Sequence, residues 1–164
     1  MKMCTEYKTK IVYKKITKNP TATQKAGFYL SQLIHEQQYS LLKKHIILIE
    51  GKVGSGKTVF TKGIAKQLKV KTHVNSPTFF LLKTYQGKII KLHHLDLYSI
   101  LTSKNPPSLF STVEELLEMV DIGDIVVAES IEKGALFFPY WDFKVCLEIV
   151  NHKTRNIIIE QKNV

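Results

Sequence analysis

One short segment constrains the fold of this chain more than any other, because it predicts a strand, a loop and a helix in a fixed order. Residues Gly51–Thr58 read GKVGSGKT and match the pattern GxxxxGK[ST] in full. The continuous apolar run His45–Glu50 comes directly before them and predicts a buried parallel strand, and Val59–Leu68 comes directly after them and predicts a helix. The pattern alone could arise by chance in a glycine-rich turn, but this context favours a phosphate-binding loop.

Each residue type in the loop has a role in binding a nucleoside triphosphate. Glycines let successive backbone N–H groups point at phosphate oxygens, and the N-terminus of the following helix adds its positive end. Lys57 is expected to reach the β- and γ-phosphates, and Thr58 is expected to offer its hydroxyl to Mg²⁺. A nucleoside triphosphate and Mg²⁺ are therefore the predicted ligands, and the family resemblance described below implies ATP. The candidate nucleotide-binding residues of this segment are Lys52, Val53, Gly54, Ser55, Gly56, Lys57, Thr58 and Val59.

A magnesium site beside such a loop needs a carboxylate, commonly at the C-terminal end of a neighbouring strand. Glu129 ends the apolar run Ile125–Ala128, which is the clearest second parallel strand in the chain. Asp96 follows the strand-like run Ile89–Leu95. Either acid could instead leave its strand into solvent, and the strand before Glu129 makes it the stronger candidate. We expect Lys57, Asp96 and Glu129 to carry catalysis, and Thr58 and Glu129 to hold the metal.

Two other polar segments have more than one interpretation. His93 and His94 could bind a metal, but neighbouring residues of a strand point to opposite faces, so packed or hydrogen-bonded histidines are favoured. The residues Ser76–Phe79 read SPTF and form either a plain entry loop to a strand or a loop in which Thr78 senses the γ-phosphate.

The rest of the chain predicts one α/β domain over residues 1–164. Its architecture is expected to be a P-loop NTPase-like three-layer sandwich, with a central parallel sheet and antiparallel edge strands. Further strands are predicted over Glu6–Ile16, Phe79–Tyr85, Ile89–Leu95, Phe143–Val150 and Arg155–Glu160. One further helix is predicted over Thr23–Gln38, and another from a cap at Ser111 or Thr112 to Met119. Asn19–Thr21 signals a helix start, and Gln86–Lys88 and Asn151–Lys153 are hairpin turns.

The net charge of +10 favours contact with a polyanion, which could be RNA, ATP or an acidic partner protein. However, the 23 lysines are scattered along the chain, so a solvated lysine surface is the favoured interpretation. Apolar runs are much shorter than the roughly 20 residues that cross a bilayer, and the N-terminus lacks a signal-peptide core, so a cytoplasmic protein without a membrane contact is expected. Cys4 and Cys146 match no disulfide framework or zinc spacing.

Four motifs in order resemble one family. GKVGSGKT, SPTF, HLDLY and a strand ending in Ala128-Glu129 are similar to those of the bacterial TsaE (YjeE) ATPases, which serve in making threonylcarbamoyladenosine on tRNA. The resemblance extends from the TxxxG motif Thr23–Gly27 to Arg155. The combination of SPTF with HxDxY is highly specific, whereas the phosphate loop alone is generic.

The resemblance implies roles for several residues. Thr58 and Glu129 would hold Mg²⁺, and Asp96 would orient water or metal. Thr78 would lie in a switch-like loop, and the backbone near Pro20 and at Thr154 would border the adenine. Two positions depart from the family pattern, since Ser99 and Ser130 stand where the family commonly has arginine and tryptophan.

The resemblance also implies that the protein works with a TsaD–TsaB-type complex, and that its lysines could face an acidic partner or tRNA. Two other function classes stay open. A nucleotide-sensing module would bind ATP and a partner but hydrolyse little. A small-molecule kinase of the shikimate or nucleotide-kinase type would need an arginine-rich lid, and the chain has a single arginine, Arg155.

Overall fold

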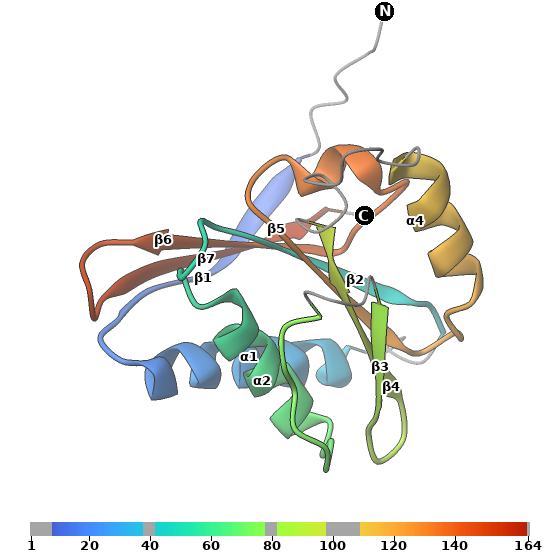
Figure 1. Cartoon of the computed structure of the whole chain (residues 1–164), viewed down its shortest axis with the longest axis horizontal. Coiled ribbons are helices and arrows are strands. Elements are labelled where there is room, and N and C mark those ends of the chain that lie inside the picture. The colour runs from blue at the N-terminus through green and yellow to red at the C-terminus, as the bar shows by residue number, and fades with distance from the viewer. Residues whose placement is uncertain (1–7, 38–41, 78–81, 98–108, 164) are drawn as a thin grey trace, which may run out of the picture.

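A seven-stranded sheet with the order β1-β7-β6-β2-β5-β4-β3 crosses the molecule (Figure 1). The structure is a computed structural model, and it describes residues 8–37, 42–77, 82–97 and 109–163. The strands are β1 (Thr9–Thr17), β2 (His45–Glu50), β3 (Leu82–Gln86), β4 (Lys91–Asp96), β5 (Ile125–Ser130), β6 (Phe143–Ile149) and β7 (Arg155–Lys162). The helices are α1 (Pro20–Glu36), α2 (Lys57–Gln67), α4 (Leu109–Glu118) and the short 3₁₀ helix η1 (Gly134–Phe137).

The centre of the sheet is parallel and its edges are antiparallel, as predicted. Strand β2 pairs in parallel with β5 on one side and β6 on the other, and β5 also pairs in parallel with β4. Strands β3, β7 and β1 add to this centre in antiparallel register. The central strands β2 and β5 are buried along almost their whole length, which explains why their sequences are continuous apolar runs.

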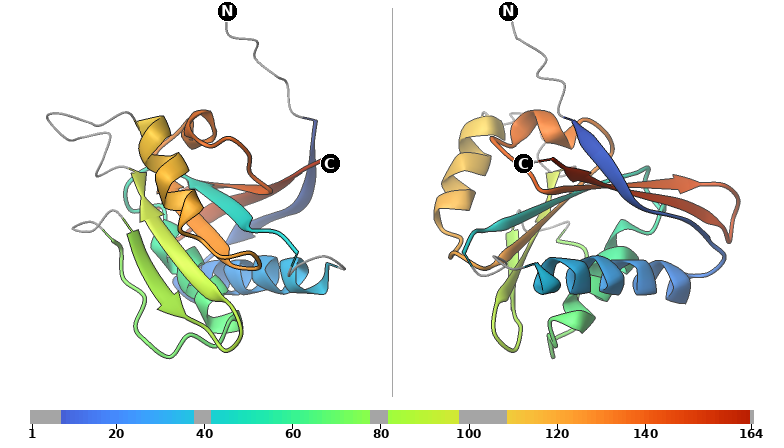
Figure 2. Two further views of the ribbon diagram at one scale, coloured as in Figure 1. Left: turned by 90° about the vertical axis from the view of Figure 1, so that its right-hand side faces the viewer. Right: turned by 180° about the vertical axis from the view of Figure 1, so that it is seen from behind.

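Helices cover both faces of the sheet and complete the three layers. Helices α1 and α2 pack on one face, whereas α4 and η1 lie on the other (Figures 1 and 2). Each face has its own hydrophobic core, with Leu30 and Phe60 in the first and Val113 and Trp141 in the second. Among the described residues no helix is both long and apolar enough to cross a membrane.

Element boundaries differ from the predictions by a few residues in several elements, and two helices show the physical reasons. Helix α1 begins at Pro20, because the Asn19 side chain accepts a hydrogen bond from the Ala22 N–H at 2.8 Å and proline suits the first turn. Residues 109 and 110 already belong to helix α4, so the prediction of a cap at Ser111 or Thr112 is wrong. The buried Val113 and Leu117 lie one helical turn apart and pack the helix against the sheet, so the helix does not depend on a hydroxyl cap at this point.

Helices α1 and α2 approach each other backbone to backbone at two glycines. A Cβ atom added at Gly27 would lie 2.0 Å from the carbonyl oxygen of Phe60. One added at Gly63 would lie 1.9 Å from the carbonyl oxygen of Gln24. Both distances are far below van der Waals contact, so this crossing requires glycine on each helix. The crossing fixes α2, and with it the loop before α2, against α1.

Gly63→Ala should therefore destabilise the protein. Alanine favours a helix over glycine by about 1 kcal/mol, but overpacking a close contact costs about 1–3 kcal/mol. Urea denaturation should show a lower free energy of unfolding for this variant than for the wild type. Lys66→Ala, an exposed change on the same helix, is the matched control. A Gly63→Ala protein as stable as that control would contradict the close helix contact.

Candidate functional site

The glycine-rich loop links the end of β2 to the start of α2, at the carboxyl edge of the parallel strands. Gly54 and Gly56 have φ values of +78° and +99°, in the left-handed region that favours glycine, and Gly56 is the N-cap of α2. The Ser55 N–H donates to the Lys52 carbonyl at 3.1 Å, which closes the turn. The loop thus has the strand–loop–helix setting that the sequence predicts.

The Lys57 side chain lies against the loop that precedes it. Its ammonium group donates to the Gly51 carbonyl at 2.7 Å and to the Lys52 carbonyl at 3.2 Å. Burial lowers the pKa of Lys57, and the nearby carboxylates of Glu129 and Asp96 act in the opposite direction. The lysine therefore places a positive charge between the loop and the two acids.

The two acids predicted for the site come together because their strands are neighbours. Asp96 ends β4, Glu129 lies near the end of β5, and the two residues pair directly in the parallel register. Adjacent strands are about 4.8 Å apart, so the carboxylates share one edge of the sheet. Both residues are buried, with exposed fractions of 7 % and 3 %. Two buried acids at this spacing favour the binding of a cation.

Glu129 is held by three side chains. Its Oε2 accepts a hydrogen bond from the Thr58 hydroxyl at 3.1 Å, and its Oε1 accepts one from the Thr61 hydroxyl at 2.9 Å. The His94 Nε2 lies 2.7 Å from the same Oε1. These contacts place the predicted metal ligands Thr58 and Glu129 side by side. They also confirm that His94 is a hydrogen-bonded histidine.

Sequence reasoning missed the contact of Thr61 and His94 with Glu129. Thr61 follows Thr58 by three residues on α2, which puts both hydroxyls on one face of the helix. His94 precedes Asp96 by two residues on β4 and so lies on the same face of the sheet. These spacings are visible in the sequence. The partner that both residues share becomes visible only when the strand order is known.

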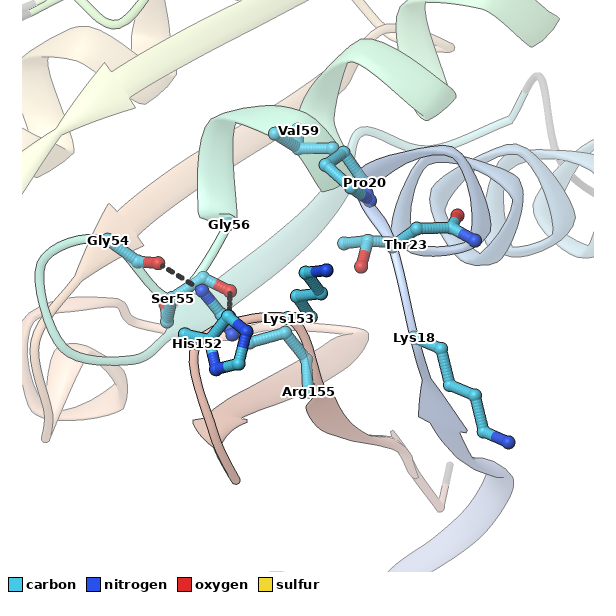
Figure 3. Close-up of a pocket in the computed structure, with 11 residues that line it drawn as sticks. Lys18, Pro20, Thr23, Gly54, Ser55, Gly56, Val59, His152, Lys153 and Arg155 are labelled. Atoms are coloured by element: carbon cyan, nitrogen blue, oxygen red, sulfur yellow. Dashed lines mark hydrogen bonds between the residues drawn. The ribbon is translucent and has the colours of Figure 1, made fainter.

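Two cavities lie along the loop and meet at Gly54, Gly56 and Val59, which line both. The Glu129 cavity has a volume of about 440 Å³. Its other lining residues are Val53, Lys57, Thr58, Ser76, Asp96, Glu129 and Ile131. The Pro20 cavity has a volume of about 530 Å³ (Figure 3). Its other lining residues are Lys18, Asn19, Pro20, Thr23, Ser55, His152, Lys153 and Arg155.

The cavities separate the predicted site residues into two groups. The Glu129 cavity contains the predicted catalytic residues, whereas Pro20 lines the other cavity. Thr154 lies between Lys153 and Arg155, which both line the Pro20 cavity. Thr78 and Ser99 lie outside the described residues, so the predicted switch loop and the first departure from the family pattern stay untested.

Arg155 connects the β6–β7 turn to the loop. Its Nε donates to the Ser55 carbonyl and its Nη2 donates to the Gly54 carbonyl, both at 3.0 Å (Figure 3). Its Nη1 donates to the carbonyls of Asn151 at 2.8 Å and Thr154 at 3.0 Å. The sequence contains one signal of this contact, which is the presence of a single arginine among 24 basic residues.

Ser130, the second departure from the family pattern, is a buried strand residue. Its exposed fraction is 1 %, and a Cβ atom added at Gly134 would lie 2.7 Å from its hydroxyl oxygen. A tryptophan would not fit in this space without a shift of the chain around η1. The neighbouring Ile131 is 38 % exposed and lines the Glu129 cavity. An apolar side chain therefore still borders the cavity at this corner.

Comparisons with known proteins identify the family of this chain. The family model described as "Threonylcarbamoyl adenosine biosynthesis protein TsaE" matches residues 17–157. A Rickettsia felis protein named "tRNA threonylcarbamoyladenosine biosynthesis protein TsaE" is 32 % identical over 144 residues, which cover 85 % of this chain and 75 % of that protein. A Bacillus subtilis protein of the same name is 45 % identical over 53 residues, covering 32 % of this chain.

The chain spans only part of several relatives. The match covers 34 % of that Bacillus subtilis protein. An Aquifex aeolicus protein of the same name is 46 % identical over 68 residues, which cover 40 % of this chain and 51 % of that protein. The crystal structure of Bacillus subtilis YdiB has the same fold, with a TM-score of 0.69 at 20 % identity over 96 % of this chain and 90 % of that one. The family model and the similar Rickettsia felis sequence show that this chain belongs to the TsaE family.

Proposed function

We propose that this protein is a cytoplasmic, Mg²⁺-dependent ATPase that acts with a TsaD–TsaB-type complex in forming threonylcarbamoyladenosine on tRNA. The observation that carries the proposal is the Gly51–Thr58 loop facing the buried Glu129. The names of the relatives support the tRNA modification, because each is called a tRNA threonylcarbamoyladenosine biosynthesis protein.

The two cavities support a specific placement of ATP. The loop amides and the N-terminus of α2 would bind the phosphates, since both present backbone N–H groups to an anion. Lys57 would move its ammonium from the carbonyls of Gly51 and Lys52 to the β- and γ-phosphates. The nucleoside would then extend past Val59 into the Pro20 cavity, where the segments near Pro20 and Thr154 would border the adenine.

The oxygen atoms beside the loop fit a magnesium ion. The Thr58 hydroxyl and the Glu129 carboxylate are hard oxygen ligands and lie 3.1 Å apart. Bound there, Mg²⁺ would neutralise the charge of the phosphate oxygens. Thr61 and His94 would keep the Glu129 carboxylate oriented toward Thr58, because both contact its other oxygen.

Asp96 would orient the water that attacks the γ-phosphate. It lines the same cavity as Lys57 and Glu129 and lies directly beside Glu129 in the sheet. A carboxylate at this place accepts a hydrogen bond from water and so directs the oxygen lone pair toward phosphorus, in line with the leaving group.

The position of Arg155 supports slow hydrolysis by the isolated chain. The only arginine of the sequence is bonded to four backbone carbonyls and so does not serve as an arginine finger. Arginine fingers raise the rate of phosphoryl transfer by about 10³–10⁵-fold, so a partner would have to supply this contact. The same observation keeps the nucleotide-sensing module as a second candidate, and it opposes the kinase, whose lid needs several arginines.

Lys57→Ala should remove most ATP binding. The change deletes a charge-assisted hydrogen bond worth about 1.5–3 kcal/mol, which corresponds to a Kd about 10–150 times higher. Isothermal titration calorimetry with Mg²⁺ and ATP measures this change. Lys66→Ala removes an exposed lysine of the same helix and is the control. Equal affinity of the Lys57→Ala and Lys66→Ala proteins would reject the phosphate-loop assignment.

Glu129→Gln should lower the rate of Mg²⁺-dependent hydrolysis by at least about tenfold, because a neutral amide is a poor ligand for magnesium. The affinity for ATP should also stop responding to magnesium, which titrations with Mg²⁺ and with EDTA measure. Glu132→Gln changes an exposed acid three residues away and serves as the control. Normal turnover in the Glu129→Gln protein would refute its role at the metal.

The cellular role is tested by nucleoside analysis of tRNA. Depletion of the protein should lower threonylcarbamoyladenosine in tRNA, measured by mass spectrometry, and the wild-type gene should restore it whereas Lys57→Ala should not. A pull-down with TsaD and TsaB homologues, with and without ATP, tests the partners. An unchanged nucleoside level after depletion would reject the tRNA-modification role. Phosphate transfer to a small acceptor rather than to water would instead favour the kinase.

A further inference from the structure

The four hydrogen bonds of Arg155 join two segments that are distant in the sequence. Arg155 is the first residue of β7 and directly follows the β6–β7 turn. Two of its bonds go to the loop carbonyls of Gly54 and Ser55, and two go to the turn carbonyls of Asn151 and Thr154. One guanidinium group therefore holds the phosphate loop and the turn against each other (Figure 3).

The bonds to the loop reach the side of the peptide groups that a phosphate does not use. In a loop that binds an anion, the backbone N–H groups point inward and the carbonyls of the same segment point outward. Gly54 and Gly56 have positive φ values on either side of Ser55, which is the backbone conformation of such a loop. A donor that fixes the Gly54 and Ser55 carbonyls therefore also fixes the orientation of the N–H groups nearby.

The hydrogen-bond count of Arg155 excludes its use as a main phosphate ligand. A guanidinium group has five N–H donors. The Nε has one, which goes to Ser55, and the Nη1 has two, which go to Asn151 and Thr154. One of the two Nη2 donors goes to Gly54. A single N–H is left, so Arg155 acts mainly through the backbone that it holds.

The choice of arginine at this position supports the same conclusion. The chain has lysine at 23 of its 24 basic positions and arginine only here. A planar guanidinium group can bond two neighbouring carbonyls from a fixed direction, whereas a lysine ammonium is a point charge on a flexible stem. The contact with two successive carbonyls of the loop is the kind of contact that lysine cannot reproduce.

We propose that Arg155 is a positioning residue that holds the loop in its phosphate-binding conformation. The proposal rests on the ATP binding proposed above. It assigns Arg155 to the affinity for phosphate groups, and not to the chemical step. Its positive charge behind the loop also favours an anion in front of it.

Arg155→Met should raise the Kd for ATP about tenfold and change the affinity for adenosine less than about twofold, since adenosine lacks the phosphates that the loop binds. Competition against a fluorescent ATP analogue measures both ligands. Arg155→Lys keeps the positive charge and serves as the variant that is least expected to disturb folding. It should recover only part of the ATP affinity, because lysine lacks the planar guanidinium group. Lys14→Met, an exposed change on β1 with the same loss of charge, should behave like the wild type.

Chemical rescue separates positioning from general destabilisation. Guanidinium ion at millimolar concentration should restore part of the ATP affinity of Arg155→Ala, whereas it should not restore that of Lys57→Ala. Equal losses for ATP and adenosine, or an unchanged ATP affinity in Arg155→Met, would overturn the inference while ATP binding by the wild type stands. A wild-type protein that binds no ATP would overturn both the inference and the proposed function.

Discussion

The parallel pairing of β5 with β2 and β4 is the constraint on which the rest of the site depends. Parallel strands end at the same edge of the sheet, so the loop after β2 meets the acids at the ends of β4 and β5. The pairing of Asp96 with Glu129 follows from the same register. A slip of one residue in either β4 or β5 would turn the carboxylate of that strand to the α4 face. The apolar runs of β2 and β5 therefore position the charged groups although they contain few charges themselves.

This arrangement buries charge, and the burial has to be compensated. Moving an ionised side chain out of water costs several kcal/mol even in a relaxed protein interior. Glu129 offsets part of that cost through the hydroxyls of Thr58 and Thr61 and through His94. Lys57 lies close enough to both acids for their charges to influence its pKa. The same hydrogen bonds and charges that would act on a nucleotide thus also offset the free-energy cost of burying the acids in the folded protein.

Much of the fold could be predicted from the sequence because its central signals are local. The apolar run of β2, the glycine pattern and the start signal at Asn19 each lie within a few neighbouring residues, and the structure confirms them. The predicted cap of α4 at Ser111 or Thr112 is wrong because the packing of Val113 and Leu117 against the sheet outweighs the preference of a hydroxyl residue for a cap. The contacts of Glu129 with Thr61 and of Arg155 with Ser55 join residues 68 and 100 positions apart, and no local pattern encodes them.

The proposed reaction needs some groups that this chain supplies and one that a partner would have to supply. The groups that would bind nucleotide and metal, which are the loop amides, Lys57, Thr58 and Glu129, all come from the chain and are already close together. Stabilising the charge that develops on the transferred phosphate needs a further cation in front of the loop. Arg155 is held behind the loop by backbone carbonyls, so it cannot serve there without releasing them. Under the proposed function, a protein built in this way would bind its nucleotide alone and would hydrolyse it fast only when a partner adds the missing charge.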